Sequence, residues 1–484
     1  MIPVLLILIP VITGLIAFFL PGEKAPKIWT LLSAIVTLGV AVAGVYSHRA
    51  AELNFDESWI PMLGARFSLS MDGMAKMLCL LTAASFPLVF GATYRNDYPK
   101  PGNFYGLMLL LQAGLMGVFL ASDCLLFYFF WELALIPAYF LCSAWGGERR
   151  IAVTFKFFVY TFLGSLLMLV AILYIYFRTP DQSFALESFY NVQLTAKEQG
   201  WLFWAFFIAF AIKMPVFPFH TWQPDTYEQA PTAVTAILSG VMVKMGLYAV
   251  IRWLLPVFPE AVAHFDHCVI WLAVAGIIYA SLIAIRQDDI KRLIAYSSIA
   301  HIGLMAAAIF ASHKAGGEIG LQGVMIQMFN HGVNVIGLWI VVDAIEQQLG
   351  SRKFSELGGL AQRAPGLAIL FVIMAFANIA LPLTNAFVGE FMMFNGLFRF
   401  SFAAAAVAGI SIILAAVYTL GMVQKVFYGN TVPRTENAVD SDLSVKLMLA
   451  ILAVVIIGLG VYPQPMIQLT NDAVEAVITK FHSI

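Results

Sequence analysis

Four charged residues stand inside long apolar stretches of the sequence: Glu132, Lys213, Lys244 and Glu390. A charged side chain at the centre of a bilayer costs at least about 2.5–3.5 kcal/mol, so an unused charge there is difficult to maintain. Burial disfavours the charged form of each group, whereas a nearby opposite charge favours it. A glutamate and a lysine that approach and separate can therefore switch the lysine between charged and neutral forms. Residues of this kind could carry protons across a membrane.

Glu132 and Lys213 are the first predicted pair of this relay. Glu132 lies near the middle of the apolar segment 123–143, and Lys213 directly precedes a segment with two prolines, Pro215 and Pro218. Proline frees backbone carbonyl groups, which water or polar neighbours must then satisfy. We predict that Lys213 titrates at a hydrated helix break and pairs with Glu132. The alternatives are a neutral carboxyl group at Glu132 and a Lys213 side chain that reaches the membrane surface.

Lys244 and Glu390 are the predicted later stations of the relay. Lys244 lies in the middle of the apolar segment 231–255, where small neighbours such as Gly240 and Gly246 permit close helix approach and water entry. Glu390 follows Pro382 within a second interrupted segment. It mirrors Lys213 and is expected to be the terminal site on one side.

Three histidines could bridge the gaps between these charges. His301 and His331 lie within the apolar segments 289–311 and 319–343, and a neutral imidazole can both donate and accept a proton. The alternative for each is a hydrogen-bonded interior histidine without a relay role. His220 lies nearer a span end and fits either role. Three further charged residues stand near span ends and are not assigned to the relay: Lys76, expected to anchor a helix end, Asp123 and Lys291.

The composition indicates the elements that must hold these residues. The chain of 484 residues is 61% hydrophobic and 11% charged, whereas soluble domains are about 25% charged. Because a membrane helix needs about 20 apolar residues, the sequence predicts an all-α polytopic membrane protein with fourteen transmembrane helices. The predicted spans are 2–20, 28–46, 73–93, 104–121, 123–143, 151–177, 201–222, 231–255, 266–285, 289–311, 319–343, 365–399, 402–427 and 443–464.

Two of the predicted spans are interrupted by proline, the seventh (201–222) and the twelfth (365–399). This spacing predicts two inverted five-helix repeats, about 104–255 and 266–427, within a single domain 1–484. The remaining helices flank the repeats. Discontinuous helices at matching positions of two halves are typical of a transport path. The segment 465–484 mixes apolar and polar residues and is expected to lie along the surface.

Charge and cysteine patterns narrow the class of protein further. Most loop Lys and Arg residues fall on the side opposite both termini, which predicts both termini on the outer side of the membrane. The first span lacks a charged leader and is expected to be a retained helix. No basic patch or glycine-rich phosphate loop suggests nucleic acid or nucleotide. Four cysteines are expected to be buried apolar residues, with no metal or redox cluster: Cys79, Cys124, Cys142 and Cys268.

Several motifs together resemble the antiporter-like subunits of respiratory complex I, a proton-pumping NADH:quinone oxidoreductase. They are the segments 129–137 (FFWELALIP), 213–225 (KMPVFPFHTWQPD), 228–232 (EQAPT) and 292–303 (RLIAYSSIAHIG). The resemblance covers nearly the whole chain. Within the family, the Glu390 segment 389–391 is similar to the M chains. The L and N chains and the Mrp-type antiporter subunits usually carry lysine at that place.

The resemblance implies a function and a set of partners. Glu132, Lys213, Lys244 and Glu390 would be the titrating residues of one proton channel in a bacterial inner (plasma) membrane. NADH, FMN, iron–sulfur clusters and quinone would be bound by partner subunits, so this chain would be a translocase subunit without its own redox centre. Its neighbours would be the L and N chains of the membrane arm, together with the lipid bilayer.

The sequence departs from the family pattern at two places. Thr226-Tyr227 stands where the family often has Ala-His, which removes a histidine near Lys213. At the second break, the segment 380–383 reads Ala-Leu-Pro-Leu, whereas the family has Gly-Leu-Pro-Gly. The second change is expected to stiffen the break. Neither change removes one of the charged residues assigned to the relay.

Two other functions compete with the proton pump. One is an Mrp-type cation/proton antiporter subunit or the membrane subunit of an energy-conserving hydrogenase; Glu390 argues against the antiporter. The other is a structural membrane subunit that does not conduct ions. Glu132, Lys213 and Lys244 argue against that function, because an inert scaffold would tend to lose such costly charges.

Overall fold

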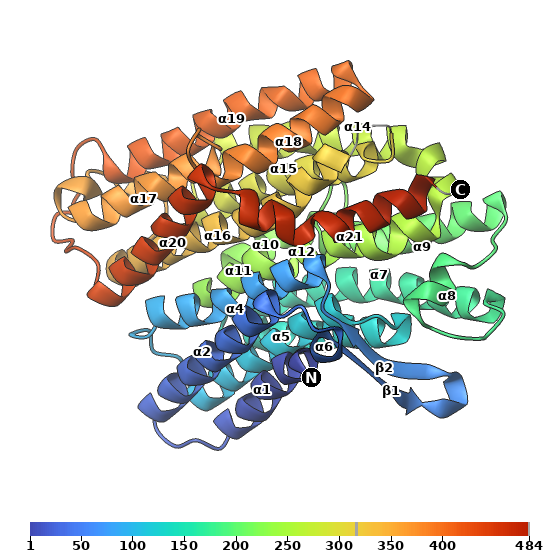
Figure 1. Ribbon diagram of the computed structural model, residues 1–484. Coiled ribbons are helices and arrows are strands. Elements are labelled where there is room, and N and C mark those ends of the chain that lie inside the picture. Colours follow the sequence, from blue (N-terminus) through green and yellow to red (C-terminus); the bar gives the residue numbers. More distant parts are fainter. Residues whose placement is uncertain (315–317, 483–484) are drawn as a thin grey trace.

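The computed structural model describes residues 1–314 and 318–482, which form a bundle of long helices (Figure 1). Eleven helices in this part of the chain are long and apolar enough to cross a membrane, which confirms the all-α membrane class. The longer elements outside the central segment 232–257 are α1 (Ile2–Ala17), α2 (Lys24–Tyr46), α4 (Gly73–Ala92), α5 (Pro101–Leu120), α6 (Cys124–Trp145), α7 (Arg150–Arg178), α9 (Ala196–Lys213), α10 (Trp222–Gln229), α14 (Pro259–Ile285), α15 (Ile290–Ala311), α16 (Glu318–Leu349), α17 (Pro365–Asn378), α18 (Asn385–Phe400), α19 (Phe402–Phe427), α20 (Leu443–Val461) and α21 (Gln464–His482).

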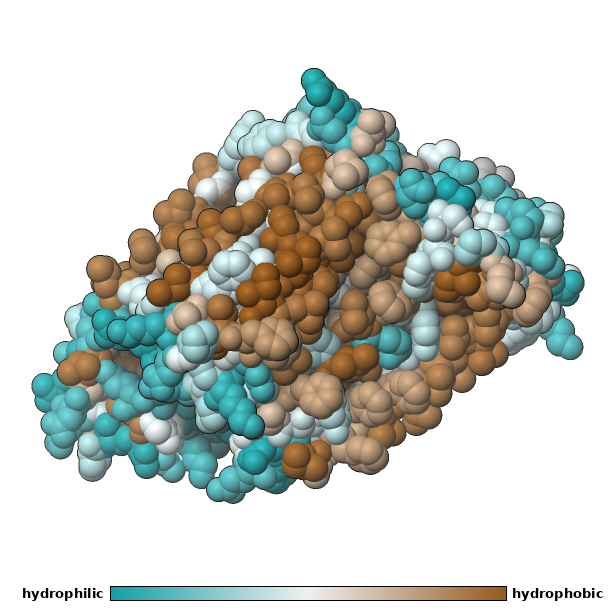
Figure 2. Space-filling view, turned by 90° about the horizontal axis from the view of Figure 1, so that it is seen from below, coloured by the Kyte–Doolittle hydropathy of each residue, from teal (hydrophilic) through white to brown (hydrophobic). Residues whose placement is uncertain are grey.

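The surface of the bundle carries a broad apolar band with hydrophilic residues at both ends (Figure 2). Helix α7 contributes exposed side chains to the apolar surface, among them Ile151, Phe155 and Val170. Such a surface is stable against lipid chains and would be costly in water. In the most apolar stretch of α20, only 22% of the residues are buried, whereas all residues are buried in the corresponding stretches of α16 and of the segment 232–257. These last two elements therefore form the centre of the bundle.

The central segment 232–257 is a helix with two π-helical turns. It consists of α11 (Thr232–Ile237), the π turn Leu238–Met242, α12 (Lys244–Ala249), the π turn Val250–Leu254 and α13 (Leu255–Val257). The sequence predicts an ordinary helix here, because hydrophobic periodicity does not reveal single wide turns. A π turn leaves backbone groups without their usual partners and is frequent at functional sites. Lys244 lies directly after the first of these turns.

The chain leaves the helical path at two places that contain proline. Helix α9 ends at Lys213, earlier than the predicted span 201–222, and α10 begins at Trp222. The second such place lies between the end of α17 at Asn378 and the beginning of α18 at Asn385. Proline cannot donate the backbone hydrogen bond that would continue a helix. We call the segments 214–221 and 379–384 the first and second breaks.

The second break contains two non-glycine residues in the left-handed region. Ala380 has φ 53° and Leu383 has φ 75°. This conformation costs about 1–2 kcal/mol for a residue with a Cβ atom. These are the two positions at which the sequence carries Ala and Leu where glycine is usual in the family pattern.

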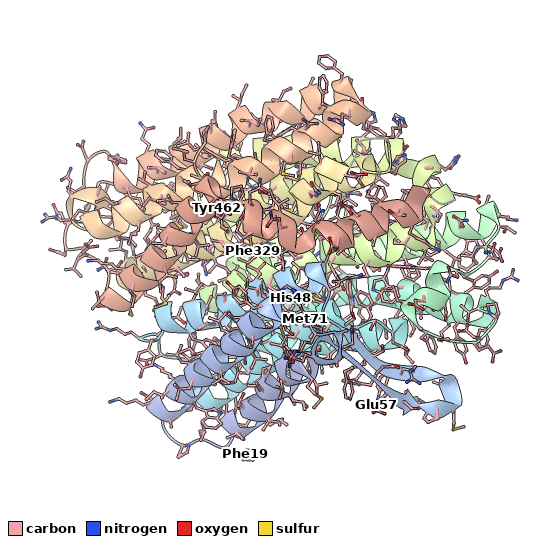
Figure 3. All side chains as sticks on the ribbon, in the orientation of Figure 1. Phe19, His48, Glu57, Met71, Phe329 and Tyr462 are labelled. Carbon is pink, nitrogen blue, oxygen red and sulfur yellow. The ribbon has the colours of Figure 1, made fainter. Side chains whose placement is uncertain are left out.

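A β-hairpin, which the sequence analysis did not predict, lies between α2 and α4. The short helix α3 (Ala50–Leu53) leads into β1 (Asn54–Ile60), which pairs antiparallel with β2 (Ala65–Ser70). The hairpin projects from the bundle and carries Glu57 (Figure 3). Hydrogen bonds from Arg66 hold the pKa of Asp56 below its usual value. These two strands are too short to stand out beside long apolar spans.

The ends of several helices differ from the predicted spans. Helix α14 begins at Pro259 instead of residue 266, α16 continues to Leu349 instead of residue 343, and α20 ends at Val461. The prediction that every cysteine is buried is wrong for Cys268, which is exposed on α14. Its helix faces lipid on one side, and a cysteine is apolar enough to lie there.

Helix α21 accounts for most of the C-terminal segment 465–484, whose last two residues lie outside the described part of the chain. One face of α21 is buried against α4 and α16, with Met466, Thr470, Val474 and Ile478 at helical spacing. On the opposite face, Gln468, Asp472, Glu475 and Ala476 are exposed. This amphipathic pattern is the one expected for a helix that lies along the surface of the bundle.

Candidate functional site

Glu132 on α6 and Lys213 at the end of α9 approach each other without a direct ion pair. Among the described residues, neither Glu132 Oε1 nor Lys213 Nζ has a hydrogen-bond partner. The Lys213 ammonium group lies 5.2 Å from the ring centre of Trp131, close enough for a cation–π interaction. The C-terminal end of a helix also favours a positive charge. The predicted direct contact between Glu132 and Lys213 is therefore not made in this structure.

Lys244 is fully buried and has two hydrogen-bond partners. Its Nζ atom donates to the carbonyl oxygen of Ser239 at 2.8 Å and lies 2.8 Å from Nδ1 of His331 on α16. The π turn presents the Ser239 carbonyl five residues before the lysine, and the Ser239 hydroxyl group accepts a bond from Trp339. When Lys244 is charged it can only donate, so His331 Nδ1 then accepts and Nε2 carries the histidine proton.

The histidines continue this line from Lys244 toward α15 and α18. His331 Nε2 lies 3.1 Å from the hydroxyl oxygen of Ser298 on α15. The rings of His331 and His301 have centres 5.6 Å apart, and among the described residues no hydrogen bond joins them. Ser298 lies one helical turn before His301 on the same helix, α15. Both histidines therefore take part in the same polar cluster as Lys244.

Glu390 lies at the far end of this cluster. Its Oε1 atom is 3.7 Å from His301 Nε2, and its side chain is only 12% exposed. Helix α18 reaches this depth because it packs closely on α16: a Cβ atom at Gly389 would lie 2.5 Å from Gln327 Oε1. A small cavity adjoins the carboxyl group, lined in part by Ser281, His301, Asn378, Ser411 and Tyr418.

Two of the predicted relay residues, Lys213 and His220, are not connected to this cluster. Lys213 Nζ makes no hydrogen bond among the described residues, so no polar contact leads from it toward Lys244. His220 is buried in the first break, where its ring packs on Phe217 and Tyr279, and its Nδ1 atom has no hydrogen-bond partner. The structure therefore joins Lys244, His331, His301 and Glu390 but leaves His220 outside this cluster.

The residues set aside at span ends have structural partners. Lys76 donates to the carbonyl groups of Val45 and Ser47 at the end of α2. Asp123 accepts from the backbone of Leu126 and so caps α6.

A cluster of ion pairs, which we call the charged end, joins α15 to the end of α16 and to α10: Lys291 with Glu346 (2.8 Å), Arg352 with Glu346 (2.8 Å) and Arg292 with Glu228 (2.7 Å). A cavity of about 750 Å³ opens there.

The sequence analysis missed the uncharged polar residues of the site. Asn378, at the end of α17, accepts a bond from His301 through its carbonyl group and donates to Ser297 and Thr419 through its side chain. Ser298 stands within a family motif but was not predicted to take part in the relay. The signal of such residues in the sequence is weak, because serine, threonine and asparagine are tolerated in membrane helices that carry no function.

Comparison with known proteins identifies the family. The family described as "NADH:quinone oxidoreductase/Mrp antiporter, TM" matches residues 121–415. NADH-quinone oxidoreductase subunit M of Rickettsia prowazekii is 36% identical over 98% of both chains, and that of Escherichia coli K12 is 34% identical over 97% of this chain and 96% of the relative. A chain of respiratory complex I from Thermus thermophilus, solved with bound NADH, superposes with a TM-score of 0.91 at 29% identity, covering 99% of this chain and all of that chain. The chain therefore belongs to the NADH:quinone oxidoreductase/Mrp antiporter membrane family, in the branch of the NADH-quinone oxidoreductase subunit M chains.

Proposed function

We propose that this chain is the proton-translocating M subunit in the membrane arm of a bacterial NADH:quinone oxidoreductase. The observation that carries the proposal is the buried line of contacts from Lys244 through His331 and His301 to Glu390. Each member can hold or release a proton, and each lies within one or two hydrogen-bond lengths of the next. A structural subunit would not need such a line in its apolar centre.

The separated Glu132 and Lys213 supply the switch of the pump. When Glu132 approaches Lys213, the pair favours the charged lysine; when they separate, burial favours its neutral form and a proton leaves. That proton crosses the gap to Lys244 through water and then follows the histidines to Glu390. The first break places Lys213 at the end of α9, where the chain leaves the helical path and water can reach the freed backbone groups.

The energy for this cycle comes from other subunits. NADH, FMN, iron–sulfur clusters and quinone are held by partner chains, and their redox reaction moves charges along the membrane arm. The chain then acts as part of an oxidoreductase without carrying its electrons. Its neighbours in the arm are the L and N chains, and it resides in the inner membrane.

The positions of the two breaks also support a proposal for the membrane topology of the chain. We infer fourteen transmembrane spans in one domain, with inverted repeats at about 104–255 and 266–427, whose seventh and twelfth spans are broken. The interruptions at 214–221 and 379–384 support this arrangement. Both termini lie on the outer side, and the charged end faces inward, in keeping with the inner location of most loop Lys and Arg residues.

Replacement of Glu132 tests the pump. In sealed inverted membrane vesicles, Glu132→Gln in the assembled complex should lower both proton uptake and coupled quinone reduction by about tenfold, because general acid–base groups usually contribute at least this much. The exposed Glu436→Gln is the matched control and should leave both rates unchanged. Normal proton uptake in an assembled Glu132→Gln complex would contradict the role of this residue.

A further inference from the structure

His301 Nε2 has two acceptors within reach, and they compete for one proton. The carbonyl oxygen of Asn378 lies 3.1 Å away, whereas Oε1 of Glu390 lies 3.7 Å away. A carbonyl group can only accept, so Nε2 carries the proton in this structure. The shorter contact directs that proton to the carbonyl group and away from the carboxyl group.

The carbonyl group of Asn378 is available because α17 ends there. The last carbonyl groups of a helix have no partner within the helix. At this break they are taken by side chains from other helices: His301 bonds Asn378, and Asn334 of α16 bonds Ala377 at 3.2 Å. The acceptor that competes with Glu390 is therefore a product of the break itself.

The side chain of Asn378 fixes the position of its own carbonyl group. Its amide group donates to Thr419 Oγ1 on α19 at 3.1 Å and to Ser297 Oγ on α15 at 3.3 Å. Thr419 is fully buried, and Ser297 in turn donates to the hydroxyl group of Tyr418 at 3.1 Å. These bonds tie the end of α17 to α15 and α19, two of the helices that line the cavity beside Glu390.

We propose that the Asn378 carbonyl group is a gate in the relay, held closed by Thr419 and Ser297, which separates His301 from Glu390 until the end of α17 moves. This proposal rests on the proposed function and adds a control point within it. The strained residue Ala380 follows two residues later, so the break already favours a change of backbone conformation. Thr419 and Ser297 are positioning residues, because they act through Asn378.

The gated step is a balanced proton transfer. His301 takes up a proton at Nδ1, which makes no hydrogen bond among the described residues, and becomes an imidazolium ion. When the carbonyl group withdraws, the Nε2–H bond breaks and an O–H bond forms on the ionised Glu390. The ring returns to its neutral form with its proton on Nδ1, and a tautomer change restores the starting state.

The test separates coupling from catalysis by removing one anchor of the gate. In sealed vesicles carrying the assembled complex, Thr419→Val should raise the population of the open gate about fivefold, the ratio that corresponds to about 1 kcal/mol for one hydrogen bond. The number of protons taken up per NADH oxidised, and the stimulation of quinone reduction by an uncoupler, should both fall. The uncoupled rate of quinone reduction should stay within about twofold of the parent rate, because the redox centres lie elsewhere.

Three variants complete the design. Thr419→Ser keeps the hydroxyl group and should restore the proton ratio. Thr82→Val makes the same change at a buried threonine that bonds only its own helix, at Leu78, and should leave the ratio unchanged. Ser297→Ala removes the other anchor and should reproduce the loss of coupling, so it replaces Thr419→Val if that variant does not assemble.

The outcomes distinguish the gate from the pump. A proton ratio that stays at the parent value in both anchor variants would overturn the gate while leaving the pump intact. Failure of Thr419→Ser to restore the ratio would also overturn the gate, because the effect would then be one of packing. If Glu132→Gln also leaves proton uptake normal, the proposed function fails with it.

Discussion

At both breaks a helix ends with an unpaired carbonyl group, but a different kind of side chain donates a hydrogen bond to it. At the first break, the freed carbonyl group of Ile212 accepts a hydrogen bond from Trp222 Nε1 at 2.9 Å, a donor that does not ionise at neutral pH. At the second, the freed carbonyl group of Asn378 accepts from His301, a member of the relay. The first break is therefore closed by a structural side chain, and the second by one that can titrate.

This difference assigns the two breaks separate tasks. Lys213 at the first break has no hydrogen-bond partner among the described residues, so its charge depends on how near Glu132 lies. Glu390 follows the second break and depends on His301, whose donor is shared with the backbone. In the proposed pump, the first break places a charge where a neighbour can switch it. In the same proposal, the second couples the shape of the backbone to the last proton transfer.

The largest expected effect comes from breaking the histidine connection at the second break. His301→Ala should lower coupled quinone reduction and proton uptake by about tenfold or more, because general acid–base groups usually contribute at least this much. His220→Ala, at the first break, makes the same change outside the cluster and should alter both rates by less than about twofold. Both are measured in sealed vesicles after the assembly of the complex has been checked. Equal losses in the two variants would remove the distinction between the breaks.

The sequence predicted the charged residues near the two breaks but not the backbone conformation around them. Glu132, Lys213, Lys244 and Glu390 stood out because charge is rare in apolar spans. The uncharged groups around Lys244 and Glu390, namely Ser298, Asn378 and the π turn before Lys244, could not be read from the sequence. These features depend on which face of each helix contacts its neighbour. A span that is buried on all sides is apolar on every face, so its sequence does not show which face that is.

The length and type of the spans followed from composition, whereas their ends did not. Proline located the breaks within a few residues, but α9 ends at Lys213 because Pro215 and the following turn remove its next bonds. The hairpin 54–70 was missed because its alternation is short. The exposure of Cys268 was missed because an apolar residue in a membrane protein can face either lipid or the interior.

A smaller effect is expected from the structural partner at the first break. Trp222→Phe keeps the buried ring but removes the N–H group that satisfies Ile212, which should destabilise the assembled complex by about 1 kcal/mol. Thermal loss of the assembled complex, followed by native electrophoresis, measures this change. Coupled turnover at a permissive temperature should stay within about twofold of the parent value, since Trp222 carries no proton. A large loss of proton uptake with unchanged thermal stability would show that the first break also takes part in proton transfer.

The smallest expected effect concerns the strain of the second break. Ala380→Gly should stabilise the complex by about 0.5 kcal/mol, because relief of the left-handed conformation exceeds the added chain entropy of glycine only slightly. Ala375→Gly, five residues earlier within α17, should instead destabilise by about 1 kcal/mol. Opposite shifts in thermal stability from the same substitution would locate the strain in the break. A destabilising Ala380→Gly would mean that the break is relaxed as it stands, and that movement of the end of α17 draws its energy entirely from the relay charges.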